Sequence, residues 1–217
     1  MKTITIILIS LISFTAMAQQ KFEGYITYGI STSGSETPGE IPKELIATYK
    51  EDQMKLEIFS TTFDFQIITN AKEEASTFII DVKKEGLSMK LALKTNKEEL
   101  KREFKMEESP RITYTNQKKR IAGYWCTKAI ISTAEGDDAY AYLSDEIKAS
   151  GFNWLLDHQL QGTIMELYWK NSDGSTHLYA TDVTRDEVHD STFEMPDGCF
   201  LISSDDVKSM LNDSLSF

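Results

Sequence analysis

The chain has 217 residues, 41% of them hydrophobic and 11% aromatic, and its 34 acidic and 23 basic residues give a formal net charge of −11. This composition excludes low-complexity disorder and collagen or coiled-coil repeats, and the acidic excess argues against nucleic acid as a partner. A chain of this length, if it is rich in β-strands, fits one domain.

Residues 1–18 have the pattern of an export signal. Lys2 gives a short positive start, residues 4–14 are mostly apolar, and Ala16-Met17-Ala18 is the small-x-small pattern that signal peptidase cuts. The apolar stretch is too short for a membrane-spanning helix, and no cysteine stands at the cleavage point to carry a lipid. We therefore expect residues 19–217 to form a single soluble domain, exported to the periplasm or the extracellular space and not spanning the membrane.

The segment that follows alternates between apolar and polar residues, which is typical of strands with one buried face. Turn signals such as Glu51-Asp52 and Glu85-Gly86 separate the alternating stretches. This spacing predicts an antiparallel meander, with strands at 22–30, 45–50, 54–60, 63–69, 77–82 and 87–93.

A short helix is expected at 97–106, because the side chains of Thr95 and Asn96 can cap its first amides. Its apolar stripe consists only of Leu100 and Phe104. So narrow a stripe suits a helix that lies on a sheet or over an opening.

The rest of the chain repeats the strand pattern, at 112–115, 121–132, 139–143, 163–170 and 176–184. The Lys-Lys-Arg run at 118–120 is interpreted as a solvated turn between the first two of these strands. Residues 145–160 are predicted to form a broken helical or loop excursion. Ser203 or Ser204 can cap a final helix at 205–215.

These ten or eleven strands and few helices predict a mainly β fold of the α+β kind. Open twisted sheets of this size tend to curl, because a flat sheet cannot bury its apolar face. We therefore expect a curved antiparallel sheet that forms an unclosed half-barrel, with short helices over its opening and a C-terminal helix.

The sequence has no motif that carries known chemistry. It lacks a GxSxG elbow, an SxxK pair and a Gly-rich phosphate loop, and His158, His177 and His189 are scattered without metal spacing. His189 adjoins Asp190 and Ser191, but neighbours in a strand or turn are not expected to face one another. We expect no enzymatic activity, no cofactor and no metal, and keep a hydrolase as a remote alternative.

Cys126 and Cys199 are the only two cysteines. In an oxidising compartment an even number of cysteines favours pairing, so Cys126 and Cys199 are a candidate disulfide. The alternative is two buried free thiols that behave as small hydrophobic residues.

Bulky apolar residues stand out at positions that face one side of the expected strands or lie in the excursion. Aromatic and Met side chains form adaptable surfaces for apolar ligands, although the same residues also suit an ordinary core. The candidates for an apolar cavity are Phe63, Phe65, Met89, Leu91, Trp125, Phe152, Trp154, Met165, Leu167 and Trp169.

Three stretches carry a resemblance to a known family: 22–28 (FEGYITY), 121–129 (IAGYWCTKA) and 193–198 (FEMPDG). Together they resemble a family of secreted envelope proteins known only as a domain of unknown function. That family is similar to the outer-membrane lipoprotein carriers and receptors (LolA/LolB-like). The resemblance implies an unclosed antiparallel barrel with helices over its opening, and an apolar cavity for acyl chains.

Two functions of different classes follow. The first is an exported, non-enzymatic binding protein that holds a lipid or acyl chain, free or on a lipidated protein, in the concave face of the half-barrel. The second is a packed scaffold module that binds another envelope protein.

Overall fold

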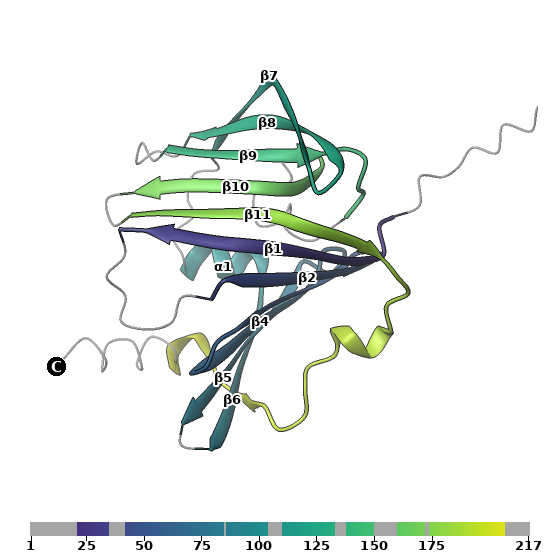
Figure 1. Ribbon diagram of the computed structural model, residues 1–217. Coiled ribbons are helices and arrows are strands. Elements are labelled where there is room, and N and C mark those ends of the chain that lie inside the picture. Colours follow the sequence, from purple (N-terminus) through teal and green to yellow (C-terminus); the bar gives the residue numbers. More distant parts are fainter. Residues whose placement is uncertain are drawn as a thin grey trace, which may run out of the picture.

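The computed structural model describes residues 21–34, 42–84, 86–103, 110–132, 138–149, 160–171 and 174–206. Within these residues the chain is mostly β: twelve strands form one sheet that does not close into a barrel, together with two short helices (Figure 1). This confirms the mainly β, unclosed architecture expected from the sequence. The predicted signal segment, Phe152, Trp154 and the end of the predicted C-terminal helix lie outside the described residues.

Most of the chain that the structure describes lies in strands. They are β1 (Gly24–Ser33), β2 (Glu44–Lys50), β3 (Gln53–Phe59), β4 (Phe63–Asn70), β5 (Ala75–Lys84), β6 (Leu87–Asn96), β7 (Arg111–Ile121), β8 (Tyr124–Ser132), β9 (Asp138–Ser144), β10 (Thr163–Asn171), β11 (Gly174–Arg185) and β12 (Phe200–Leu201). The helices are α1 (Lys97–Glu103) and a 3₁₀ turn, η1 (Asp190–Phe193).

The order of strands across the sheet is β12-β6-β5-β4-β3-β2-β1-β11-β10-β9-β8-β7. The two predicted meanders are therefore joined by the pairing of β1 with β11, and every pair is antiparallel except β12 with β6. The sheet has twelve strands, one more than the ten or eleven that the sequence predicted. That strand, β12, is two residues long and pairs in parallel with a strand far away in the sequence, so alternation could not reveal it.

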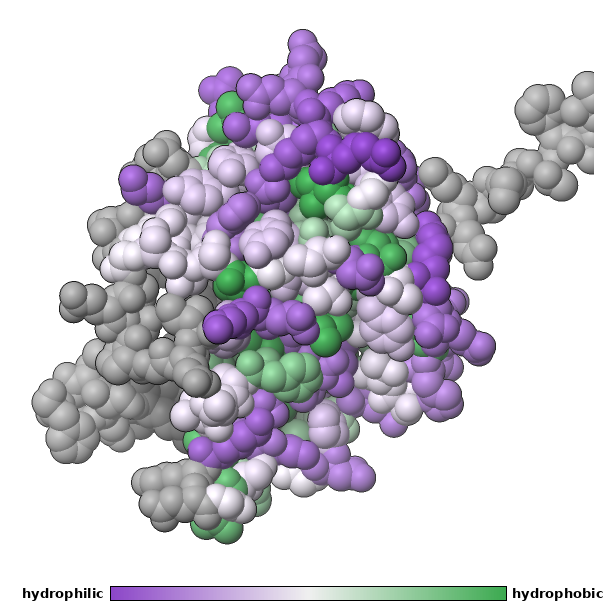
Figure 2. Space-filling view, in the orientation of Figure 1, coloured by the Kyte–Doolittle hydropathy of each residue, from purple (hydrophilic) through white to green (hydrophobic). Residues whose placement is uncertain are grey.

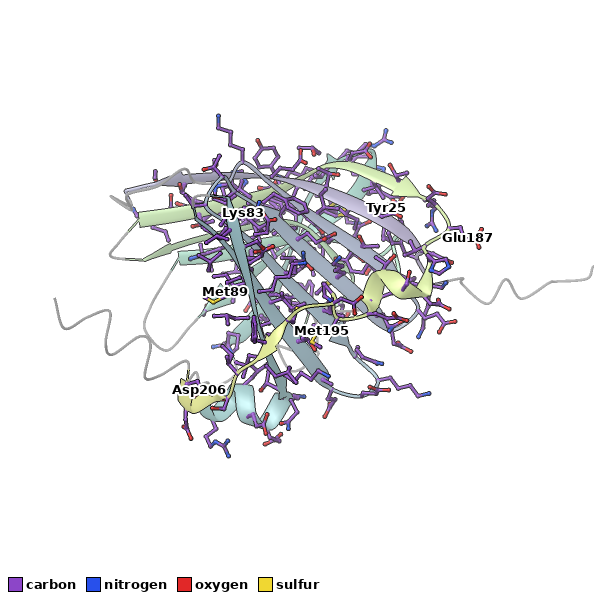
Figure 3. The ribbon with its side chains drawn as sticks, turned by 90° about the horizontal axis from the view of Figure 1, so that it is seen from below. Tyr25, Lys83, Met89, Glu187, Met195 and Asp206 are labelled. Atoms are coloured by element: carbon purple, nitrogen blue, oxygen red, sulfur yellow. The ribbon has the colours of Figure 1, made fainter. Side chains whose placement is uncertain are left out.

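The two faces of the sheet are covered by different parts of the chain. The core face carries Ile26, Leu45, Ala47 and Leu56, which are buried in the largest hydrophobic cluster. The opposite face, here called the strap face, is crossed at β3–β6 by residues 186–199, the strap. Figure 3 shows the strap passing over these strands between Glu187 and Met195.

Apolar and polar contacts both hold the strap. Val188 and Phe193 bury their side chains against Ile68 and Ile79, whose side chains point to the strap face. The Lys50 ammonium donates to the Val188 carbonyl at 2.7 Å and pairs with Asp190 at 2.6 Å. This hydrogen-bonded pair raises the pKa of Lys50 and lowers that of Asp190.

Local capping agrees with the sequence in part. Asn96 Oδ1 accepts a hydrogen bond from the Glu99 amide at 3.0 Å, and Glu99 Oε2 accepts one from the Asn96 amide, so Asn96 caps α1 with a capping box. Ser203 Oγ accepts from the Asp206 amide in the same manner at the start of a further helical turn. His189 and Ser191, expected not to face each other, do meet at 2.7 Å, because His189 caps η1.

The run at 118–120 is not a turn, contrary to expectation. Lys118, Lys119 and Arg120 belong to β7, and the turn into β8 is made by Ala122 and Gly123, both with positive φ. An irregular register between Tyr114 and Lys118 interrupts the β7–β8 ladder.

The predicted disulfide is wrong. Cys126 and Cys199 are both free thiols: Cys126 is buried in β8, and Cys199 is half-buried in the strap, packed against the cluster of Ile68 and Ile79. The strap packs on β4 and β5, whereas β8 lies near the opposite end of the sheet. Burial raises the pKa of the Cys126 thiol to about 11.

None of the helices formed by the described residues is both long enough and apolar enough to cross a membrane.

Candidate functional surfaces

An apolar surface occupies the core face at the end of the sheet that carries β12. Side chains directly opposite one another across β4, β5, β6 and β12 form two neighbouring rows. These rows, here called the apolar wing, are Phe63–Val82–Met89 and Phe65–Ile80–Leu91–Phe200.

The apolar wing is open, whereas the strap face behind it is closed. Ile80 is 36% exposed and Met89 is 49% exposed, and Phe200 is more exposed still. On the strap face of the same strands, Ile79 and Ala92 are buried beneath the strap. Contiguous exposed apolar side chains of this kind are typical of a binding surface.

The sequence of β5 explains why both faces of this wing are apolar. Phe78, Ile79 and Ile80 follow one another, so Ile79 points to the strap while its two neighbours point to the core face. Consecutive apolar residues in a strand normally indicate burial on both faces. Here only one face is fully covered.

Four of the predicted cavity residues, Phe63, Phe65, Met89 and Leu91, therefore come together in the apolar wing. The others that the structure describes do not join them. Met165 is fully buried beside a bulge in β10, and Leu167 packs in a separate cluster on the core face. Trp169 lies on β10, which is five strand positions away from β4, and it is partly exposed.

Trp125 lies apart from the apolar wing as well. It is exposed beside the β7–β8 turn, and the Arg120 guanidinium lies 5.9 Å from the centre of its ring.

A second surface, which the sequence did not predict, lies on the strap face of β9, β10 and β11. Successive ring centroids are 5.9, 5.2, 6.1 and 5.2 Å apart along a U-shaped path over these three strands, whose two end residues both lie opposite Glu166. This ring row consists of Tyr142, Tyr140, Tyr168, His177 and Tyr179.

A buried carboxylate lies within the ring row. Glu166 Oε2 pairs with the Lys119 ammonium at 2.5 Å, and Glu166 Oε1 accepts a long hydrogen bond from the Tyr140 hydroxyl at 3.5 Å. His177 Nε2 lies 3.2 Å from Glu166 Oε1 but makes no hydrogen bond to it. Burial, and then the negative charge of Glu166, raise the pKa of Tyr140.

Lys119 reaches Glu166 because the β7–β8 hairpin folds over the sheet. In Figure 1 this hairpin crosses in front of β9, and β7 contacts β11 as well as β8. The Lys119 ammonium lies 4.1 Å from the centre of the Tyr142 ring, and that of Lys128 lies 4.5 Å from the centre of the Tyr140 ring. Both distances are those of cation–π contacts.

Tyr179, at the other end of the ring row, lies against β1. A Cβ atom added to Gly29 would be 2.6 Å from Cζ of the Tyr179 ring, so the ring can pack here only because residue 29 has no side chain. Figure 2, seen from the side on which the hairpin crosses β9, shows mostly pale side chains of intermediate hydropathy over β8–β11.

A signal for the ring row was present in the sequence. Tyr140 and Tyr142, and likewise His177 and Tyr179, are two residues apart in strands and must share a face.

Among the residues that the structure describes, no three His, Cys, Asp or Glu side chains come together as a metal site requires.

No family model matches the sequence, and no curated protein matches it either. Among solved structures, two crystal forms of PNGF-II are similar to this chain. The P21 form matches over 89% of this chain with 15% identity and a TM-score of 0.58, and the C2 form over 89% with 16% identity and a TM-score of 0.57. This chain spans 34% and 33% of those chains, about one third of their length, and at such low identity the similarity concerns the fold alone.

A β-barrel-like protein of a domain of unknown function from Brucella abortus also matches, over 77% of this chain and 99% of its own length, at 8% identity. Its TM-score of 0.37 is too low to bear on the fold. The resemblance to the lipoprotein carriers and receptors is not confirmed by these matches.

Proposed function

We propose that this protein binds a hydrophobic ligand, an acyl chain of a lipid, on the apolar wing, and that it does so without chemical turnover. The observation that carries the proposal is that two contiguous apolar rows on β4, β5, β6 and β12 contain four exposed side chains, and that their other members are only half-buried. Exposed apolar side chains that touch one another gain free energy when a ligand removes them from water.

The dimensions of the wing suit a chain-like ligand. The longer row crosses four strands, and adjacent strands are about 4.8 Å apart, so it spans about 14 Å. Each methylene of a ligand that is buried there contributes about 0.8 kcal/mol, and six contribute about 5 kcal/mol.

The wing is also built to keep its shape when it is empty. Its strands pair along their full length, and the strap packs against their other face. Met89 provides an adaptable side chain at the edge of the surface, which tolerates ligands of differing shape.

The test is uptake of a fluorescent fatty acid by the full chain and by Ile80→Asp and Met89→Asp variants. A carboxylate placed among apolar side chains must be desolvated when the ligand binds, so each change is expected to weaken binding by about tenfold or more.

Ile130→Asp is the matched control. Ile130 is a β-branched residue inside a strand with 43% exposure, close to that of Ile80, but it belongs to β8 at the other end of the sheet. The control is expected to bind the fatty acid as the unchanged chain does. A wild-type chain that takes up no fatty acid, or equal weakening in Ile130→Asp and Ile80→Asp, would refute the proposal.

A further inference from the structure

The ring row has the features of an interaction surface of its own, on the opposite face of the sheet from the apolar wing. Ligand pockets for small molecules are concave, whereas the ring row extends over three neighbouring strands, with Tyr179 38% exposed and the other four rings half-buried. Tyr is enriched where proteins bind other proteins, because its ring provides contact area and its hydroxyl a hydrogen bond.

The rings are held in place before any partner binds. Tyr140 stacks on Tyr168 with a centroid distance of 5.2 Å, and the Lys128 ammonium lies over the Tyr140 ring. Tyr179 packs where Gly29 leaves room for its ring. Side chains that are already ordered lose little conformational entropy on binding, which is the property of residues that dominate an interface.

The charges of the ring row favour an acidic partner. Its one carboxylate, Glu166, is buried and already paired with Lys119, so it repels a partner's acidic groups only weakly. The ammonium groups of Lys119 and Lys128 lie at the end of the row nearest to β7 and β8, and each has further hydrogen-bond donors to offer. At the other end, on β11, exposed Asp182 accepts a hydrogen bond from Thr184 and limits the positive region to the lysine end.

We infer that the ring row is a docking surface for a segment of a partner protein that presents apolar or aromatic side chains together with acidic residues. The apolar side chains lie on the tyrosine rings, and the acidic residues lie next to Lys119 and Lys128. This surface is distinct from the apolar wing, so both can be occupied at once.

A random copolymer of Glu and Tyr is the probe, and its binding to the full chain is measured by isothermal titration calorimetry. Lys128→Gln removes a charge and Tyr179→Ser removes a ring, and each is expected to weaken binding by about tenfold. Lys94→Gln is the matched control, because Lys94 is an exposed lysine on the strap face of β6, outside the ring row. It is expected to leave binding unchanged.

Gly29→Ala provides a second variant that deletes no side chain of the row. The added methyl group would meet only side-chain atoms at the outer end of the Tyr179 ring, so it is expected to displace the ring and weaken copolymer binding by about fivefold while the chain stays folded. None of these variants should change uptake of a fatty acid by the apolar wing.

Four results would overturn the inference. The first is no binding of the copolymer at all, and the second is equal weakening by Lys94→Gln, which would mean attraction by net charge alone. The third is equally tight binding of polyglutamate, because the rings would then contribute nothing. The fourth is tighter binding of heparin that Lys128→Gln abolishes, which would assign the surface to an anionic polysaccharide.

Discussion

The ion pair between Lys119 and Glu166 is predicted to stabilise the position of the β7–β8 hairpin over the sheet, and its contribution to the free energy of unfolding can be measured. Lys119→Met removes the ammonium but keeps the apolar stem, and Glu166→Gln removes the charge but keeps the shape of the carboxylate. Together with the double variant they form a cycle that isolates the interaction between the two side chains.

The magnitude follows from their distance and exposure. Two unit charges 4 Å apart attract by about 4 kcal/mol at an effective dielectric constant of about 20, and these charges are closer, at 2.5 Å. Lys119, however, is 41% exposed, and solvent screening reduces exposed pairs to about 0.2–1 kcal/mol. We therefore expect a coupling free energy of about 2 kcal/mol between Lys119 and Glu166, which lies between these two limits.

The two single changes should differ in size. Lys119→Met leaves a carboxylate that is only 6% exposed without its cation, and it removes the ammonium from the Tyr142 ring, so a loss of about 3 kcal/mol is expected. Glu166→Gln leaves an ammonium that can return to water, and we expect a loss of about 2 kcal/mol. The double variant should be about as stable as Lys119→Met alone.

Urea unfolding at neutral pH, extrapolated to water, measures the four free energies. A coupling below about 0.5 kcal/mol would show that the pair does not hold the hairpin, and a larger loss for Glu166→Gln than for Lys119→Met would refute the reasoning from burial.

Three further predictions concern single side chains. Burial raises the pKa of Tyr49 to about 12, from about 10 in the unfolded chain. The stability that the protonated Tyr49 contributes is therefore complete below about pH 10, and it falls by about 2–3 kcal/mol as the pH rises towards 12. Tyr49→Phe should reduce this fall in the free energy of unfolding, measured with urea, and an unchanged fall would contradict the pKa shift. In a thiol-labelling assay at pH 8, Cys126 should react only after unfolding, because it is buried and has a pKa of about 11. The unreduced, unfolded chain should gain two labels, one on each cysteine. If it gains no label, Cys126 and Cys199 form a disulfide. Trp169→Ala should cost about 1–2 kcal/mol in urea unfolding, because Trp169 is 37% exposed, whereas a loss of about 3–5 kcal/mol would place the indole in a packed core.

Much of the strand pattern could be predicted from the sequence, because alternation is a local property. The strands from β2 to β6 and from β9 to β11 lie where the alternation of apolar and polar residues placed them, within a few residues. The convergence of Phe63 with Met89 and of Phe65 with Leu91 follows from the same information, since short turns force neighbouring strands to pair.

The remaining features depend on contacts between distant parts of the chain. The run at 118–120 is rich in Lys and Arg, as a turn would be, but tertiary structure places Lys119 against Glu166, which is 47 residues further along the chain. The disulfide prediction failed for a similar reason. An even number of cysteines shows that a disulfide could form, but it does not show that the two residues lie close enough in the fold to form one.

The two candidate surfaces lie diagonally across the sheet, and the way the chain covers its own strands explains this arrangement. The strap covers the strap face at β3–β6, and Leu160 packs against Ala129 and Leu143 on the core face of β8 and β9. Among the described residues, the apolar wing on the core face at β4–β6 and the ring row on the strap face at β9–β11 both keep partly exposed side chains. Sites so placed share no side chain, and substitutions at separate sites act independently. A chain carrying both Ile80→Asp and Tyr179→Ser should therefore lose fatty-acid uptake and copolymer binding each by the same factor as the corresponding single variant, and a factor that changes in the double variant would show that the sheet couples the two surfaces.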